Sequence, residues 1–130
     1  MQREIVNPPG VAAPLANYSH VARVGDTLYI SGQVAVDAEN NLVGRGDAEG
    51  QAEQCLRNIE TILKHYGAGL SNVVKITTYI TNFGFRPLVG AARDRAFSAP
   101  YPASTLVVIS ALASPDFLVE IEAIAALDDS

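Results

Sequence analysis

Apolar and polar residues recur in short runs along the chain, and these runs predict five strands and two helices. Residues 21–24 and 28–30 are apolar-rich runs on either side of Gly25 and Asp26. Glycine accepts the positive φ of a tight turn, so this segment predicts a β-hairpin. The preceding residues 7–19 are rich in Pro, Gly, Asn and Ala, which indicates an extended loop.

A helical stripe follows the hairpin and a polar turn region at 37–47. Apolar side chains recur there at spacings of three and four, on one face of a helix of about five turns: Ala52, Cys55, Leu56, Ile59, Ile62, Leu63 and Tyr66. Asp47 is the expected N-cap, and Gly67 or Gly69 is the expected end.

The second half of the chain predicts three more strands and a second helix. The β-branched residues of 70–82 favour a strand. Residues 83–97 favour a helix that begins near Pro87, whose fixed φ suits a first turn. The last strands are expected at 104–112 and 117–127. This order predicts an α+β two-layer sandwich with both helices on one face of a mixed sheet.

The face of the sheet that the helices leave open is expected to need a partner. The segments TLVVISAL (105–112) and IEAIAAL (121–127) are apolar at most odd and most even positions. In a sheet with one solvated face, apolar and polar residues alternate along each strand. We therefore expect the open face to pack on other subunits; the alternative is that loops cover it. No linker or composition change divides residues 1–130, so one domain is expected.

Composition narrows the function classes. The chain has 130 residues, is 48% hydrophobic and 18% charged, and carries a net charge of −5. This composition is typical of a globular domain, and the acidic balance argues against non-specific nucleic-acid binding.

Targeting, membrane and metal signals are weak. The single cysteine, Cys55, excludes an intrachain disulfide and fits a cytoplasmic protein. We expect no signal peptide and no membrane span, since no apolar segment approaches the roughly 20 residues that a span needs. His20 and His65 lie far apart in the sequence, so we expect no zinc site and no cofactor.

Two carboxylates in the closing segment VEIEAIA (119–125) raise a question about chemistry. Strand alternation puts Glu120 and Glu122 on one face, and Val119, Ile121 and Ala123 on the other. From these residues alone, Glu120 is more simply a solvent-facing residue of an alternating strand.

Four segments together identify a family resemblance: YSHVARVGDTLYISGQVAVD (18–37), VVKITTYITN (73–82), YPAST (101–105) and VEIEAIA. In this order they resemble the RidA/YjgF family of reactive-intermediate (enamine/imine) deaminases, from about Val11 to Ala126. The resemblance implies a chorismate-mutase-like α+β fold, a homotrimer and three clefts between adjacent subunits, which agrees with the expectation for the open face.

The resemblance also implies a site of which half is retained. Tyr18, Gly32 and Glu120 match the family's pattern, whereas the glutamine after the tyrosine-serine pair is replaced by His20. The family's Pro-Ala-Arg segment, whose arginine holds the substrate carboxylate, has Ser104 in the arginine's place. A hydroxyl offers one donor against five and no charge.

Roles follow for the retained residues, each with a structural alternative. Glu120 is the expected catalytic residue, which orients water and shuttles its proton. Tyr18 is expected to donate a hydrogen bond to the substrate or stack on it, or else to be a core tyrosine. The backbone N–H of Gly32 is expected to approach the ligand, or else Gly32 marks a β-bulge.

The altered positions are expected to line the same cleft. Gly90 aligns loosely with a family asparagine on the second helix. Ser104 and Thr105 are expected to enlarge the cleft or bind a neutral ligand; otherwise they are strand residues of a dead site. Arg93 or His20 is a candidate for the missing charge, although arginines on a helix more often lie on its solvated face. Cys55, on the apolar stripe, is expected to be a packing residue.

These observations lead to three hypotheses of function. The first is a hydrolase that releases ammonia from an enamine or imine of an unsaturated amino acid, extending to a longer, aminomuconate-like substrate. The second is an inactive small-ligand-binding or regulatory trimer. The third is the ribonuclease or translation-inhibitor activity attributed to some relatives, which the acidic balance disfavours because RNA contacts need Lys and Arg.

Overall fold

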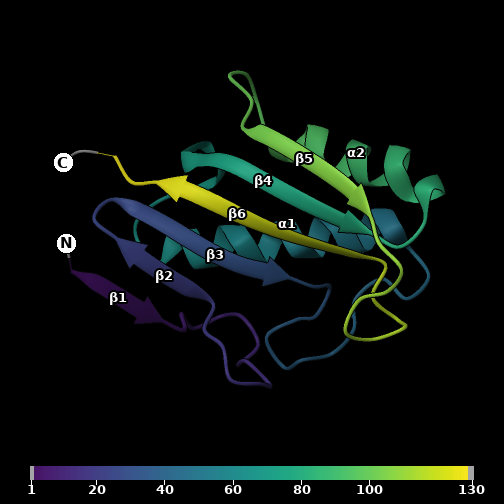
Figure 1. The fold of residues 1–130 in the computed structure, drawn as a ribbon, viewed down its shortest axis with the longest axis horizontal. Helices are drawn as coiled ribbons and strands as arrows, with labels where there is room; N and C mark the ends of the chain where they lie inside the picture. Colours follow the sequence, from purple (N-terminus) through teal and green to yellow (C-terminus); the bar gives the residue numbers. More distant parts are fainter. Residues whose placement is uncertain (1, 129–130) are drawn as a thin grey trace.

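A six-stranded sheet in the order β1-β2-β3-β6-β4-β5 organises the computed structural model, which describes residues 2–128. Its elements are β1 (Arg3–Val6), β2 (Val21–Val24), β3 (Thr27–Gln33), α1 (Ala48–Lys64), β4 (Val73–Ile80), α2 (Arg86–Ala96), β5 (Ala103–Val108) and β6 (Val119–Ala126). Both helices lie behind one face of the sheet (Figure 1). The predicted α+β two-layer architecture is therefore confirmed.

The N-terminal half forms a three-stranded meander. β2 and β3 pair antiparallel around a turn in which Gly25 has φ +59°, as the hairpin prediction requires. β1 was not predicted. It is a short edge strand whose first three residues are exposed, and it pairs antiparallel with β2. A strand held by backbone pairing with a neighbour leaves little mark in the hydrophobic pattern.

The C-terminal strand, β6, lies in the interior of the sheet, between β3 and β4. β6 runs antiparallel to both β3 and β4, and β5 is parallel to β4 across the α2 crossover. A strand paired on both sides has its two faces fixed by register. The position of β6 therefore determines which of its side chains face the helices.

The core lies between the helices and the sheet. Its largest buried apolar side chains are Leu28, Ile59, Ile62, Leu63, Ile76, Ile80 and Ile121. Asp47 caps α1 by accepting a hydrogen bond from the Gly50 N–H, as predicted. The helix ends at Lys64, before the predicted glycines, and Gly67 (φ +70°) lies in the turn that follows.

Several predicted boundaries are too wide. A one-turn 3-10 helix at Leu70–Asn72 occupies the first residues of the segment predicted as a strand. Another at Phe83–Phe85 occupies the first residues of the segment predicted as a helix. β5 stops at Val108, and the following residues cross to β6 as a loop. Apolar runs extend into these turns because the turn residues also pack against the core, as Leu70 and Phe85 do.

The open face is more polar than its sequence pattern predicted. β4 turns Lys75, Thr77 and Tyr79 toward this face, all half-buried, while Ile76, Thr78 and Ile80 face the helices. Its apolar and aromatic members include Ile5 of β1, Tyr29 of β3 and Val107 of β5, which are exposed, and Ile124 of β6, which is half-buried. Polar side chains therefore run along the centre of the open face.

Candidate functional site

Glu120 lies near the start of β6, on the open face of the sheet. The burial pattern of the strand alternates, with Val119 and Ile121 buried against the helices and Glu120 half-buried on the opposite side. The neighbouring strand places Tyr79 directly opposite Glu120. The carboxylate is thus part of a packed surface, and the solvent-facing alternative for this residue is only half correct.

Gly32 makes room for this carboxylate. The pairing of β3 with β6 shifts register between Ile30 and Gln33, so Gly32 lies at a β-bulge. A Cβ atom built on Gly32 would lie 2.2 Å from Oε2 of Glu120. The bulge and the close approach are therefore one feature, in which the bare backbone lies against the carboxylate.

Tyr18 and His20 approach the same place from the loop before β2. The Tyr18 side chain is 50% exposed and meets the His20 ring edge-on, with centroids 6.0 Å apart. His20 is buried. Its Nε2 lies 2.6 Å from the Ala12 carbonyl, and its Nδ1 lies 3.1 Å from Nε2 of Gln33. Both ring nitrogens of His20 are thus engaged within the chain, whereas the Tyr18 hydroxyl is available to a ligand.

These residues line a hollow of about 490 Å³, which we call the Glu120 hollow. Asn58 of α1 and Phe117 of the loop before β6 complete its wall. None of the described residues that line it is a lysine or arginine. Its charged member is the Glu120 carboxylate.

The surroundings of Glu120 favour its neutral form. Burial raises the pKa of Glu120, and the negative charge of Glu122 raises it further. The Tyr79 hydroxyl donates to Glu122 at 2.5 Å, and this hydrogen bond raises the pKa of the tyrosine. A carboxylate whose pKa is moved toward neutrality is suited to taking up and returning a proton.

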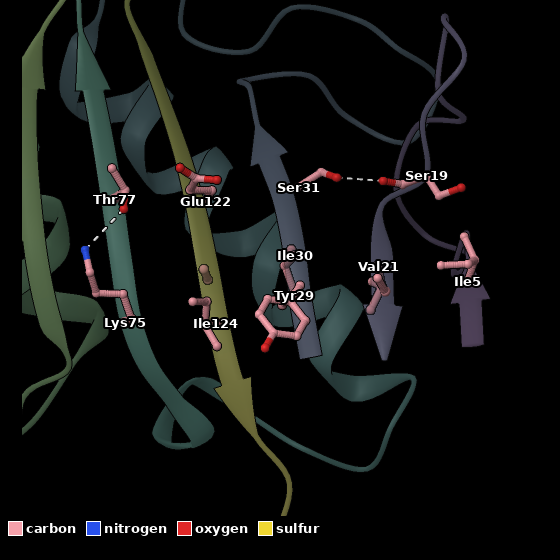
Figure 2. Close-up of a pocket in the computed structure, with 12 residues that line it drawn as sticks. Ile5, Ser19, Val21, Tyr29, Ile30, Ser31, Lys75, Thr77, Glu122 and Ile124 are labelled. Atoms are coloured by element: carbon pink, nitrogen blue, oxygen red, sulfur yellow. Dashed lines mark hydrogen bonds between the residues drawn. The ribbon is translucent and has the colours of Figure 1, made fainter. Parts of the chain in front are cut away.

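A second, larger hollow of about 580 Å³ lies further along the open face (Figure 2). Glu122 of β6, Tyr29 of β3 and Lys75 of β4 line it. The ammonium of Lys75 is held by the hydroxyls of Thr77 and Thr105, at 3.2 and 3.0 Å. Since partners within the chain already engage its Lys75 and Glu122, this hollow is a weaker candidate for chemistry.

The predicted pair Ser104 and Thr105 points to opposite faces of the sheet. Thr105 pairs with Thr77 and contacts Lys75 on the open face. Ser104 pairs with Ile76, whose side chain is buried toward the helices. One site in a single chain therefore cannot contain both side chains, because successive strand residues alternate between faces.

Ser104 belongs to a third hollow, of about 510 Å³, which we call the α2–β5 hollow. Arg93 and Phe97 line it from α2 and its C-terminal end, and Tyr101 lines it from the loop before β5. Gly90 lies one helical turn before Arg93, and a Cβ atom built there would be 3.5 Å from Nη2 of Arg93. Arg93 and Ser104 thus share this hollow, whereas Gly90 lies beside Arg93 without lining it.

Most of the predicted site residues therefore fall into two sets within one chain, and Thr105, beside Lys75 on the open face, belongs to neither. Tyr18, Gly32 and Glu120 lie together on the open face, whereas Arg93 and Ser104 lie on the helix side, at the edge strand β5. β4 separates the strands that carry Glu120 and Ser104. A contact between the two sets within one chain is excluded by the sheet itself.

Sequence reasoning missed the buried amides that support the Glu120 hollow. Asn58 donates to the carbonyls of Val34 and Val36, at 3.1 Å each. Gln51 donates to the Asp116 carbonyl and accepts from the Leu118 N–H, both at 2.9 Å. Both amides lie on the buried face of α1, where a polar residue in an apolar stripe indicates a hydrogen-bonding role.

Cys55, metal ligation and membrane spans were the remaining subjects of sequence prediction, and Cys55 is the packing residue that its place on the apolar stripe predicted. Cys55 is fully buried, its thiol lies 3.7 Å from the Val119 carbonyl, and burial raises its pKa. Within residues 2–128, no group of three or more His, Cys, Asp or Glu side chains is arranged to hold a metal ion. The described helices are also too short or too polar to cross a bilayer.

Comparisons with known proteins agree with this geometry. A family profile described as Endoribonuclease L-PSP matches residues 10–127. The 2-iminobutanoate/2-iminopropanoate deaminase of Dermatophagoides farinae is 30% identical over 126 residues, 97% of this chain and 98% of that protein. The 3-aminoacrylate deaminase RutC of Acinetobacter baylyi is 30% identical over 125 residues, 96% of this chain and 98% of that protein.

The fold comparison covers the same span. The crystal structure of RidA from an Antarctic Psychrobacter species matches with a TM-score of 0.88 at 33% identity, over 95% of this chain and 99% of the other. The span matched by the family profile includes both strands that frame the Glu120 hollow, β3 and β6. The similarity therefore extends to the elements that build the candidate site.

Proposed function

Because this chain belongs to the endoribonuclease L-PSP family, the family of the RidA and RutC proteins, we propose that it is an imine deaminase. It hydrolyses a 2-imino acid, or the enamine tautomer of one, to the 2-oxo acid and ammonia. Two of the relatives named above are deaminases of this kind by name. The observation that carries the proposal is the Glu120 carboxylate, held against Gly32 in a hollow that Tyr18 borders.

The proposed reaction needs one group that both takes and returns a proton. The Glu120 carboxylate takes a proton from water as the hydroxide oxygen bonds to the iminium carbon, which gives a tetrahedral carbinolamine. The protonated Glu120 then returns that proton to the amino nitrogen, and the C–N bond breaks. The remaining O–H proton passes through Glu120 to ammonia, so iminium and water become 2-oxo acid and ammonium.

We further propose that the working unit is a homotrimer with its sites at the seams between subunits. The two sets of site residues face opposite sides of the sheet in one chain, so a complete site needs the Glu120 hollow of one subunit and the α2–β5 hollow of another. β5 is the last strand of the sheet and is free on one side to meet a neighbour.

We propose that the substrate is a small or medium-sized imino acid that carries a carboxylate. A longer, aminomuconate-like substrate, expected from the widened cleft, is the second substrate to test. An inactive ligand-binding trimer is the alternative, because Ser104 replaces the arginine expected from the resemblance. A ribonuclease is disfavoured, since the Glu120 hollow has no cationic side chain among its described lining residues.

The test is a deaminase assay with a matched pair of variants. Imines are generated in situ from L-amino acids by an amino-acid oxidase, and free imine is trapped by semicarbazide, which competes with the enzyme. We expect Glu120→Gln to lower kcat/KM at least about 100-fold with oligomer and fold intact. Glu39→Gln, an exposed carboxylate, should be unchanged. Equal activity of Glu120→Gln and wild type would exclude the proposed mechanism.

A further inference from the structure

We propose that Arg93 binds the substrate carboxylate and that the α2–β5 hollow selects 2-imino acids with an apolar side chain. This inference rests on the deaminase function proposed above. It assigns the missing cation to α2, on the opposite side of the α2–β5 hollow from Ser104 of β5. It also assigns the class of side chain that the substrate carries.

The first step is the charge balance of the site. The named substrates of the two relatives are iminobutanoate, iminopropanoate and aminoacrylate, and each of these is a carboxylate. A carboxylate taken out of water needs a cation or several hydrogen-bond donors. The Glu120 hollow contributes a negative charge, and Glu122 lies on the same face of β6. The cation must therefore come from the other half of the site.

The second step is that Arg93 is free to serve this role. Its side chain is 40% exposed, and its Nε and Nη2 donate at 3.3 and 3.2 Å to the adjacent Asp94, which is 71% exposed and also lines the hollow. Such surface pairs contribute about 0–1 kcal/mol, so a ligand carboxylate in the hollow can displace Asp94. A guanidinium also offers a planar pair of donors that matches a carboxylate in two-pronged geometry.

A neighbouring arginine shows the contrast on the same helix. Arg95, two residues further along α2, is turned toward α1, where it pairs with Glu49 at 2.9 Å and with Glu53. It lines the groove between the helices, away from Ser104. The two arginines have the same charge and similar exposure but different surroundings, which makes Arg95 the matched control.

The third step is the shape of the α2–β5 hollow. Phe97, Tyr101 and Ile76 give it apolar walls, and Ser104 adds a hydroxyl beside Arg93. Tyr101 is 69% exposed, and exposed aromatic surface is typical of a site that contacts a ligand or a neighbouring subunit. Serine at 104 leaves volume that a longer side chain would fill. A carboxylate at Arg93 and Ser104 can then extend an aliphatic or aromatic group along Phe97 and Tyr101.

The experiment compares four proteins: Arg93→Gln, Arg93→Lys, Arg95→Gln, and the double variant Arg93→Gln with Ser104→Arg. Deamination is measured with imines from L-alanine, L-leucine and L-phenylalanine and with 2-aminomuconate. Binding of the product-like acids pyruvate, 4-methyl-2-oxopentanoate and phenylpyruvate is measured by calorimetry. The binding measurement does not depend on catalysis.

We expect Arg93→Gln to raise KM and the Kd of the oxo acids about 10- to 100-fold, the range of a charge-assisted hydrogen-bonded pair. Arg93→Lys should recover part of this loss, and Arg95→Gln should stay within about twofold of wild type. The double variant should bind pyruvate again but not the two bulky acids, since the arginine fills the hollow. Wild type should prefer the leucine and phenylalanine imines to the alanine imine.

The outcomes separate this inference from the proposed function. If wild type deaminates an imine and Arg93→Gln does so equally well, the role of Arg93 is overturned and the proposed deaminase function stands. Oxo-acid binding that requires Arg93, without turnover of any imine, supports the carboxylate site and overturns the deaminase. A preference for the alanine imine or for 2-aminomuconate overturns the apolar side-chain assignment. Absence of both binding and turnover overturns both proposals.

Discussion

At the scale of single residues, the contact between Gly32 and Glu120 is the sharpest constraint in the candidate site. Gly32→Ala would place a methyl group 2.2 Å from the Glu120 carboxylate, which forces the carboxylate to move. We expect kcat/KM to fall about 10- to 100-fold, because small displacements of a positioned group are costly. The deaminase assay measures this, with circular dichroism to confirm that the fold is retained.

The matched control for this substitution is Gly69→Ala. Gly69 has an extended backbone (φ −146°), and a Cβ atom there meets nothing within 4 Å. Its activity should equal that of wild type. A Gly32→Ala protein as active as Gly69→Ala would mean that the carboxylate does not need its present position.

The neighbouring carboxylate is the second of two causes that raise the pKa of Glu120. The charge of Glu122 raises the pKa of Glu120, after burial. Glu122→Gln removes that charge, and the oxygen of the new side-chain amide can still accept from the Tyr79 hydroxyl. The pKa of Glu120 then falls, so its carboxylate form persists to lower pH. The acid limb of the kcat/KM profile, where Glu120 must be ionised to act as a base, should shift to lower pH.

The profile is measured in parallel for wild type and for Glu39→Gln, whose acid limbs should coincide. Because the substrate titrates identically in all three proteins, a difference between limbs reports on the enzyme. An acid limb of Glu122→Gln that stays in place or moves to higher pH would contradict Glu120 as the titrating base.

At the scale of elements, α1 supports the site through buried amides. Asn58→Leu removes two hydrogen bonds to the carbonyls of Val34 and Val36, and leaves the Gln54 amide with only its longer contact to the Val36 carbonyl, at 3.4 Å. Three hydrogen bonds of the Asn58 amide are lost, each with a net contribution of about 0.5–1.5 kcal/mol, so we expect a loss of about 2–4 kcal/mol in the free energy of unfolding. Urea denaturation at one fixed protein concentration measures this.

Lys64→Ala, at an exposed position in the last turn of the same helix, is the comparison and should cost less than about 0.5 kcal/mol. If Asn58→Leu is equally mild, the amide contributes little to stability. In that case the loop at 34–36 is held by other contacts.

The elements also show how far the sequence could be interpreted. The β2–β3 hairpin and α1 follow from local patterns, because a turn glycine and a 3.6-residue period each act within a few residues. β1 depends on pairing with β2, and its exposed Arg3 and Glu4 carry no apolar alternation. The opposite orientation of Ser104 and Thr105 follows from strand alternation alone. Which of the two faces the helices depends on the register of β5 on β4, a long-range property that the sequence pattern does not contain.

The site residues divide in the same way. Glu120, Tyr18 and Gly32 could be grouped in advance because the resemblance to a family supplied their proximity. The position of Arg93 beside Ser104 required the direction of α2 across the sheet. The engagement of both His20 nitrogens required knowledge of the loop that brings Ala12 beside it, which no period or spacing encodes.

At the scale of the whole molecule, the proposed seam between subunits makes a prediction that no single chain can satisfy. Glu120→Gln and Arg93→Gln disable different halves of the site. Mixed trimers of the two variants each contain one seam with both halves intact. Co-expression of the two chains in equal amounts should therefore restore about a quarter of wild-type activity at substrate concentrations well below KM. About three in four random trimers are mixed, and one seam in three of each is intact.

Tyr18→Phe mixed with Glu120→Gln is the matched control. Tyr18 and Glu120 line the same hollow of one chain, so every seam in such a mixture retains a defect in that hollow. Native mass spectrometry verifies that mixed trimers have formed. Restoration in both mixtures, or in neither, would contradict a site shared between Glu120 of one subunit and Arg93 of the next. Activity restored only in the first mixture would show that the two halves of the site, which the sheet separates within one chain, meet between neighbouring subunits.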